Sequence, residues 1–266
     1  MITNMHRVHI ATFFTPDRPP VREESSESAA NTLRELYAYP AETPRPWIRV
    51  NFVSSIDGAV SVDGVSGALG TPADALVFAT LRELADVVLV GAGTVRAENY
   101  GGARVGAEGR RRRVASGMPE VPPIAVLSAR AHLDPQARLF TDTEVAPIVV
   151  TCADADPARI RALTDAGARI VTAGDGQITS EGLLAALDDL GLRRVLCEGG
   201  PSLFGQLIAD DAVDEVCLTT APVLAGGTAG RVATAPNARI TSMTPAHILT
   251  DTDGTVLTRW VRMPRP

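Results

Sequence analysis

Apolar runs that alternate with capped helical segments are the feature that most limits how this chain can fold. The run at residues 87–91 is apolar almost throughout, as in a strand that is covered on both faces. Before it, Thr71 and Pro72 open a helical segment with an N-cap residue, a proline at the first helical position and an acid in the first turn. Further strands are expected at 124–128, 148–151, 169–173 and 194–197, with helices from residue 156 and over residues 179–190. Such a chain folds into a mainly parallel sheet with helices on both faces, a three-layer α/β/α sandwich.

The two ends of the chain depart from this alternation. Residues 1–45 mix charge, serine and proline, and the polar stretch at 15–28 is unsuited to a core. We therefore predict an N-terminal extension at 1–45 and a single domain at 46–266. That domain opens with an alternating strand at Trp47. Near the C-terminus two alternating runs flank Asp253-Gly254, which predicts that the mixed sheet ends in an antiparallel hairpin.

The charge of the chain limits its partners. The formal net charge is −6 and the pI is near 5.3, which argue against a nucleic-acid binder. The one basic run, Arg110–Arg113, is interpreted as a solvated loop, with a phosphate site as the alternative. No apolar stretch has the length needed to span a bilayer, and the N-terminus lacks the residue order of a signal peptide. We expect a cytoplasmic protein that makes no membrane contact.

The cysteines and histidines show no pattern of a disulfide framework or a metal centre. Three cysteines lie far apart with no C-x-x-C pair, and two of them fall in apolar runs, so buried free thiols are expected. The four histidines lack the spacing of metal ligands. We therefore expect no metal.

Two glycine-rich loops follow expected strands, at Gly91–Thr94 and at Gly199–Ser202. In a parallel α/β sheet ligands lie beyond the carboxyl ends of the strands, where glycines let backbone N–H groups approach an anion. A diphosphate would fit between the two loops. The alternative explanation for the glycines in each loop is tight packing of the turn from strand to helix. The first loop is no Rossmann fingerprint, because Arg96 stands where the third glycine belongs. The next strand ends in Ser128 and Arg130, which suit a 2′-phosphate and favour NADPH over NADH; the alternative for Arg130 is a plain surface residue.

The stretch at residues 51–71 is rich in small residues and runs from a strand to a helix start. Asp57-Gly58 and Asp63-Gly64 within it are turn signals. The composition is also that of a flap over a site. No serine or cysteine has the setting of a nucleophile, so covalent catalysis is not expected.

Five ordered blocks resemble a known family from about residue 47 to the C-terminus: VNFVSSIDG, RELADVVLVGAGTVRAENY, LSARAHLDP, VLCEGGPSLFGQLI and VDEVCLTTAPVLAGG. They are similar to the reductase domain of the bifunctional riboflavin-biosynthesis deaminase/reductase. The resemblance implies a dihydrofolate-reductase-like fold, a homodimer and NADPH-dependent reduction of 5-amino-6-(5-phosphoribosylamino)uracil or a close relative to the ribitylamino product. The zinc-ligand pattern of the deaminase does not occur in this sequence, so only reduction is expected.

The resemblance also assigns site residues. The NADPH diphosphate would be held by Gly91, Gly93, Thr94, Gly199, Gly200, Ser202 and Leu203, with Ser128 and Arg130 near the adenosine phosphate. Substrate contacts would come from Thr71, Arg82 and Arg104. Asn51, on the strand before the flap, is a further candidate for a substrate contact. By the same match Glu198 would lie beside the reacting ring. Independently of the resemblance, the reaction needs a proton donor, and Asp57 or Glu198 is expected to deliver or relay the proton, aided by a pKa that burial raises. The family's acidic pair followed by proline is replaced here by Glu98-Asn99-Tyr100.

The sequence is compatible with three hypotheses about the function. The first is the reductase of the riboflavin precursor. The second is a pterin or dihydrofolate reductase, in which Asp74 pairs with an aminopyrimidine edge; the alternative for Asp74 is a carboxylate that serves the helix dipole. The third is a non-catalytic NADPH-binding protein. Arg82 likewise fits either a phosphate ligand or a surface arginine with an apolar stem.

Overall fold

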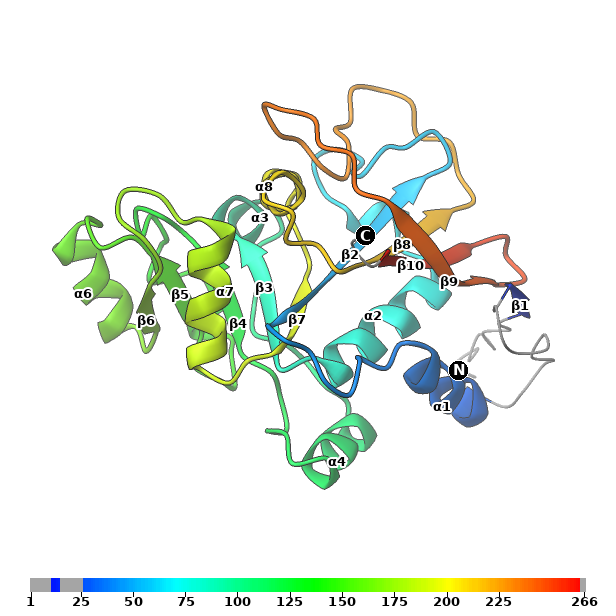
Figure 1. Ribbon diagram of the computed structural model, residues 1–266, viewed down its shortest axis with the longest axis horizontal. Helices are drawn as coiled ribbons and strands as arrows, with labels where there is room; N and C mark the ends of the chain where they lie inside the picture. Colours follow the sequence, from blue (N-terminus) through cyan, green and yellow to red (C-terminus); the bar gives the residue numbers. More distant parts are fainter. Residues whose placement is uncertain (1–10, 15–25, 264–266) are drawn as a thin grey trace, which may run out of the picture.

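The computed structural model describes residues 11–14 and 26–263, and the side chains from residue 30 onward (Figure 1). A ten-stranded sheet has the order β1-β9-β10-β8-β2-β7-β3-β4-β5-β6. Its strands are β1 (Ala11–Phe14), β2 (Trp47–Ser55), β3 (Val87–Gly91), β4 (Ile124–Leu127), β5 (Ile148–Thr151), β6 (Arg169–Thr172), β7 (Arg194–Cys197), β8 (Glu215–Ala221), β9 (Met243–Thr250) and β10 (Val256–Arg262). The helices are α1 (Ser26–Leu36), the 3₁₀ turn η1 (Gly67–Leu69), α2 (Pro72–Leu84), α3 (Ala92–Ala97), α4 (Ala107–Ala115), α5 (Arg138–Thr141), α6 (Pro157–Asp165), α7 (Ser180–Asp189) and α8 (Pro201–Ala209). None of these described helices is long and apolar enough to cross a membrane.

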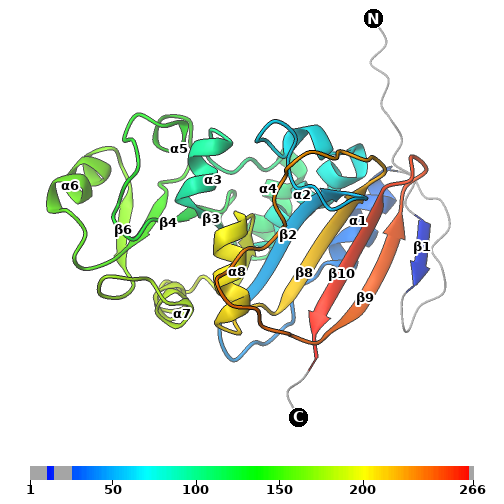
Figure 2. The ribbon, with the colours of Figure 1, turned by 90° about the horizontal axis from the view of Figure 1, so that it is seen from above.

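Helices cover both faces of the sheet, as the sequence predicts (Figure 2). Successive residues of a strand point to opposite faces, so Val88 and Val90 of β3 enter one core while Val87 and Leu89 enter the other. Helices α1, α2, α3, α5 and α6 contribute to the first core, and α7 and α8 to the second. The cysteines are buried in these cores, which confirms that expectation. The three-layer α/β/α sandwich is therefore confirmed.

The two edges of the sheet differ in direction. Strands β8, β2, β7, β3, β4, β5 and β6 run parallel to one another. The predicted hairpin is present as β9 and β10, and β10 also pairs antiparallel with β8. Beyond it, β1 pairs antiparallel with β9, and Leu33 and Tyr37 at and just after the end of α1 are buried against the first core. Part of the expected N-terminal extension thus packs on the sheet; residues 15–25 of its polar stretch lie outside the described residues.

Helix α2 begins as predicted, with the Thr71 side chain accepting a hydrogen bond from the backbone N–H of Asp74. At the C-terminal end of α2, the structure shows that the prediction for the basic run was wrong. Residues 110–113 lie in helix α4 and are not a solvated loop, and Arg113 is fully buried. The Arg113 guanidinium donates to the carbonyl oxygens of Glu83 and Ala85, which have no partner within the helix. The basic run was misread because an arginine that caps another helix looks like a surface charge in the sequence.

A buried ionic cluster joins β2, β8 and β10. Glu215 of β8 accepts hydrogen bonds from Arg49 of β2, at 2.6 Å, and from Arg259 of β10, at 2.8 Å. Trp47 Nε1 donates to the same carboxylate. Arg49 and Glu215 are fully buried, and the two cations hold the pKa of Glu215 at about 2 although burial alone would raise it. The cluster fixes the three strands whose ends support the site.

His247 on β9 is expected to make the fold sensitive to mild acid. It lies against the Tyr37 ring, and burial, with Arg259 and Arg49 nearby, lowers its pKa from 6.5 to about 3. Between these pH values the unfolded chain binds a proton at this histidine and the folded chain does not. As the pH is lowered through this range, His247 should therefore reduce the free energy of unfolding by about 1.4 kcal/mol per pH unit. Urea unfolding of the wild type and of His247→Phe between pH 7 and pH 4.5 measures the difference. An equal decline in both would contradict the assignment.

Candidate functional site

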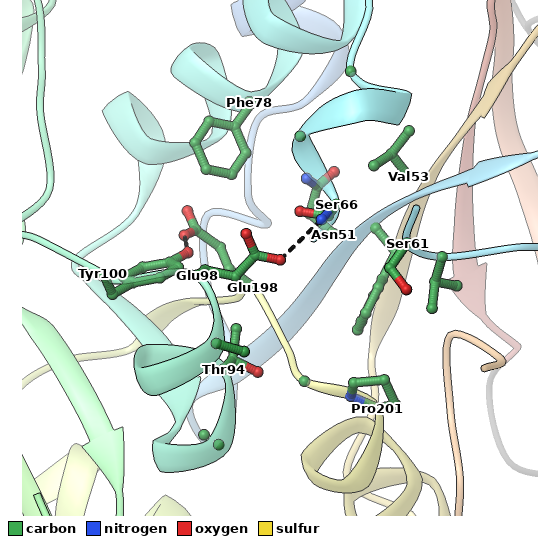
Figure 3. Close-up of a pocket in the computed structure, with 18 of the residues that line it drawn as sticks. Asn51, Val53, Ser61, Ser66, Phe78, Thr94, Glu98, Tyr100, Glu198 and Pro201 are labelled. Atoms are coloured by element: carbon green, nitrogen blue, oxygen red, sulfur yellow. Dashed lines mark hydrogen bonds between the residues drawn. The ribbon is translucent and has the colours of Figure 1, made fainter. Parts of the chain in front are cut away.

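A cavity of about 820 Å³ opens at the carboxyl ends of β2, β3 and β7. Its walls come from β2, the flap at residues 60–70, helix α2, the two glycine loops with the starts of α3 and α8, and residues 98–102 (Figure 3). Ligands of parallel α/β sheets bind at such strand ends. The flap, predicted from its small residues, lines one side, where Glu98 accepts a hydrogen bond from the Ser66 backbone N–H.

The two glycine loops meet at the base of this cavity, as predicted. The Gly91 N–H donates to the Gly199 carbonyl oxygen at 2.8 Å. A Cβ on Gly200 would lie 2.3 Å from Thr94 Oγ1, so a side chain at residue 200 would push the loops apart. At Gly199 the φ is +102°, a conformation that favours glycine. By contrast, a Cβ on Gly93 would meet no atom within 4 Å, because that glycine faces open space.

Glu198 follows β7 and forms the centre of one wall. Arg82 of α2 donates two hydrogen bonds to it, from Nε to Oε1 at 2.7 Å and from Nη2 to Oε2 at 2.8 Å. The Tyr100 hydroxyl donates to the same Oε2, as Figure 3 shows. The Arg82 guanidinium also lies over the Phe78 ring, 4.3 Å from its centre. This network fixes the carboxylate in one orientation beside the cavity.

Two oxygen-bearing side chains line the part of the cavity between β2 and α2. Asp74, in the first turn of α2, accepts a hydrogen bond from Thr219 Oγ1 at 2.6 Å, and its partial burial raises its pKa. Asn51 of β2 is 8% exposed. In the part of the chain that the structure describes, its Oδ1 has no hydrogen-bond partner.

The family described as the RibD C-terminal domain matches residues 46–257. The chain belongs to this family. It is 29% identical over 184 residues to a 2,5-diamino-6-ribosylamino-4(3H)-pyrimidinone 5′-phosphate reductase of Archaeoglobus fulgidus, covering 69% of this chain and 83% of that protein. It is 26% identical to the riboflavin biosynthesis protein RibD of Bacillus amyloliquefaciens, covering 75% of this chain and 52% of RibD. The solved structure of a pyrimidine reductase-like protein from Corynebacterium diphtheriae is 27% identical, with a TM-score of 0.77, and covers 88% of this chain and 99% of that one.

The cavity gathers many of the residues that the sequence suggested. Around the cavity lie Asn51, Asp74, Arg82, Gly91, Gly93, Thr94, Glu198, Gly200, Ser202 and Leu203. Gly199 adjoins them through its bond to Gly91. Ser128 follows Leu127, the β4 partner of Gly91, so it lies at the neighbouring strand end; it is buried and accepts from the His132 N–H, while Arg130 is exposed. These two do not line the cavity.

Asp57 lies outside the cavity, and its setting does not support a proton-transfer role. Its carboxylate accepts hydrogen bonds from the Ser55 hydroxyl and from the N–H groups of Ala225 and Gly226. These bonds lower its pKa to about 2, opposite to the raised value that we expected. Asp57 ties the start of the flap to the loop after β8.

Thr71 and Arg104 do not line the cavity either. Thr71 caps α2, as described above. Arg104 is half exposed and forms ion pairs with Asp142 and Glu144. Its charge is thus already balanced by two carboxylates, which weakens the case for a phosphate ligand.

Several residues that line the cavity were not predicted from the sequence, and Tyr100 and Phe78 are the most important of them. Arg138 of α5 also lines the cavity and donates to Asp142 at 2.6 Å. The one available signal was the segment Glu98-Asn99-Tyr100, which departs from the pattern expected of the family. That departure places an aromatic hydroxyl where proline was expected, and the hydroxyl meets Glu198.

Proposed function

We propose that this protein is an NADPH-dependent reductase of a phosphorylated ribosylaminopyrimidine, the reaction class for which its RibD-type relatives are named. The observation that supports this most directly is the single cavity in which both glycine loops and the fixed Glu198 carboxylate converge. A reductase of this kind needs a dinucleotide and a small polar ring in contact. A homodimer belongs to the same proposal, on the family resemblance alone.

The residues at the cavity base fit the dinucleotide. Gly93 has open space where a side chain would lie, and Gly91 and Gly200 bring the loops together, so backbone N–H groups can approach an anion. We assign the diphosphate to Gly91, Gly93, Thr94, Gly199, Gly200, Ser202 and Leu203, and the adenosine phosphate to Ser128 and Arg130. When bound, NADPH supplies the hydride.

Glu198 orients the substrate in this proposal. Arg82 and Tyr100 hold its carboxylate still, so it can accept a hydrogen bond from an N–H group of the substrate near the carbon that is reduced. Arg82 therefore acts on the substrate through Glu198, because its guanidinium is engaged on two sides. The flap and Phe52, whose ring stacks on the buried Phe204, line the cavity and limit the water around this point.

Gly93→Ala tests the cofactor site without disturbing the fold. A Cβ at residue 93 meets nothing in the protein, so the free energy of unfolding should stay within about 0.5 kcal/mol of the wild type. The added methyl would stand where the dinucleotide must approach, and we expect the Kd for NADPH to rise at least about tenfold, or about 1.4 kcal/mol. Fluorescence titration measures this. Gly106→Ala, which also adds a Cβ to open space, is the matched control; equal affinities in both variants would refute the cofactor placement.

A pterin reductase is the second candidate, and Asp74 is the observation that favours it. A partly buried carboxylate in the cavity can pair with the aminopyrimidine edge of a pterin. NADPH oxidation, followed separately with the phosphoribosylaminopyrimidine and with dihydrofolate, separates the two. Turnover of dihydrofolate alone would overturn the first proposal. Tight NADPH binding with no turnover of either would leave the non-catalytic alternative.

A further inference from the structure

We propose that Asp57 joins the flap and the loop after β8, residues 222–235, into one lid that closes over a dinucleotide bound between the two glycine loops. Asp57 is then a positioning residue of the reductase, because it acts through these two segments and does not touch the substrate. The inference rests on the proposed function, to which it adds the moving part of the site.

The joint between the two segments lies at the turn that precedes the flap. The Ile56 N–H donates to the Val223 carbonyl oxygen at 2.9 Å. The Asp57 carboxylate accepts hydrogen bonds from the N–H groups of Ala225, at 3.1 Å, and of Gly226, at 2.7 Å. Hydrogen bonds to an ionised group are stronger than those between neutral groups. The link between the segments therefore depends chiefly on this one side chain.

Away from this joint, each segment is anchored beside one of the two glycine loops. On the flap, the Ser66 N–H donates to Glu98, the residue directly after α3, and α3 starts in the first glycine loop. On the other segment, the Thr234 N–H donates to the carbonyl oxygen of Pro201 at 3.0 Å, and Pro201 begins α8 in the second glycine loop. The two arms of the lid are thus attached to the two elements between which we place the dinucleotide.

Both segments have room to move and both border the cavity. Residues 222–231 are exposed throughout, and a Cβ on Gly64 or Gly226 would meet no atom within 4 Å. Exposed segments with few buried contacts open locally at a low cost in free energy. Figures 1 and 2 show the two segments side by side beyond the strand ends, and the cavity lining includes Ser61 of the flap and Gly230 of the loop. A ligand in the cavity therefore meets both segments.

Joining the segments changes how a bound molecule is held. Two independent segments would each have to be ordered on binding, and the opening of either one would uncover part of the site. When the segments are joined, contact with one arm also orders the other, and the site opens only when both arms detach. The expected effect of the joint is therefore a slower dissociation of the dinucleotide, with little effect on its association.

Asp57→Asn tests the joint at constant side-chain size. Its NH2 group must face one of the donors that the carboxylate now accepts, so at least one charge-assisted bond is lost. We expect the dissociation rate of NADPH to rise at least about tenfold and the association rate to stay unchanged. Stopped-flow fluorescence measures both rates, and urea unfolding shows that the variant is folded.

Asp63→Asn is the matched control for Asp57→Asn. Asp63 begins the second Asp-Gly turn of this stretch, is exposed and does not line the cavity, so this variant should keep the wild-type dissociation rate. A merely structural role of Asp57 would lower the free energy of unfolding without separating the two rates. An unchanged dissociation rate in Asp57→Asn overturns the inference.

Amide hydrogen exchange, followed by mass spectrometry, measures the two segments separately. In the wild type, NADPH should slow exchange in residues 60–66 and in residues 222–235 together. In Asp57→Asn the flap should stay protected while the protection of residues 222–235 is lost, because Gly230 is the one residue of that described loop in the cavity lining. Protection of the flap alone in the wild type would refute the joint and leave the cofactor site standing.

The free protein decides the inference if NADPH does not bind, an outcome that by itself removes the proposed function. Glu98→Ala deletes the acceptor of the Ser66 N–H, whereas Glu98→Gln keeps one. With joined segments, Glu98→Ala should speed exchange at least about threefold in both the flap and residues 222–230, and Glu98→Gln in neither. Faster exchange in the flap alone overturns the inference. If NADPH protects both segments but neither the phosphoribosylaminopyrimidine nor dihydrofolate is reduced, the lid stands and the proposed function falls.

Discussion

Glu198→Ala is expected to lower kcat/KM for pyrimidine reduction by about a thousandfold. The reason is that the carboxylate is a preorganised hydrogen-bonding group, and loss of one such group in a closed site costs about 10²- to 10³-fold in rate. Its removal also leaves the Arg82 guanidinium, whose side chain is 13% exposed, without its counter-ion. Steady-state kinetics with NADPH and the pyrimidine substrate measures the effect.

Two further variants decide whether Glu198 acts on the substrate or only on the fold. Glu98→Gln alters another cavity carboxylate, bound to the Ser66 N–H, and should change kcat/KM by less than about tenfold. The double variant Glu198→Leu with Arg82→Met removes both charges and should unfold at nearly the wild-type urea concentration, since an apolar pair can replace an ion pair. We expect the double variant to stay inactive. Recovery of activity together with stability would assign Glu198 a purely structural role.

Glu215→Gln is expected to cause the largest loss of stability, about 3–5 kcal/mol. The substitution leaves Arg49, which is fully buried, and Arg259 facing each other without their shared anion. Such a loss is a large part of the total stability of an ordinary domain. Urea unfolding at pH 7 measures it.

The control for Glu215 is an exposed carboxylate with a similar number of arginine partners. Glu144 pairs with Arg104 and Arg110 and is 38% exposed, so Glu144→Gln should cost less than about 1 kcal/mol. If Glu215→Gln does not fold, Glu215→Leu combined with Arg49→Met and Arg259→Met should restore a folded protein.

Acid provides an independent check of the cluster. The arginines hold the pKa of Glu215 at about 2, against 4.5 for an ordinary glutamate. The stability that it contributes is present above pH 4.5 and is lost as the pH falls toward 2. Equal stability losses for Glu144→Gln and Glu215→Gln, or acid unfolding that is the same with and without Glu215, would contradict this account.

The order of strands and helices could be predicted from the sequence because its signals are local. The apolar run at 87–91, the N-cap at Thr71 and the turn at Asp253-Gly254 each depend on residues within a few positions of each other. The meeting of the two glycine loops could also be predicted, because parallel strands bring their carboxyl ends to one edge of the sheet.

The contacts that individual side chains make across the fold could not be predicted in the same way. Arg113 caps α2 from a helix about thirty residues away, and Asp57 binds a loop 168 residues further along the chain. Tyr100 meets Glu198 across 98 positions. Nothing near these residues in the sequence marks the group that each contacts.

The sequence by itself thus determined the α/β layers and the meeting place of the two glycine loops, since periodicity and chain direction are properties of short segments. Only the tertiary structure decided which charges are free. It engages Arg82 with Glu198, balances Arg104 and withdraws Asp57 from the cavity. It also leaves the Asn51 side-chain oxygen without a hydrogen-bond partner among the described residues. The physical reason is that a charged or polar group takes its function from the partner that burial imposes on it, and burial is a property of the whole fold.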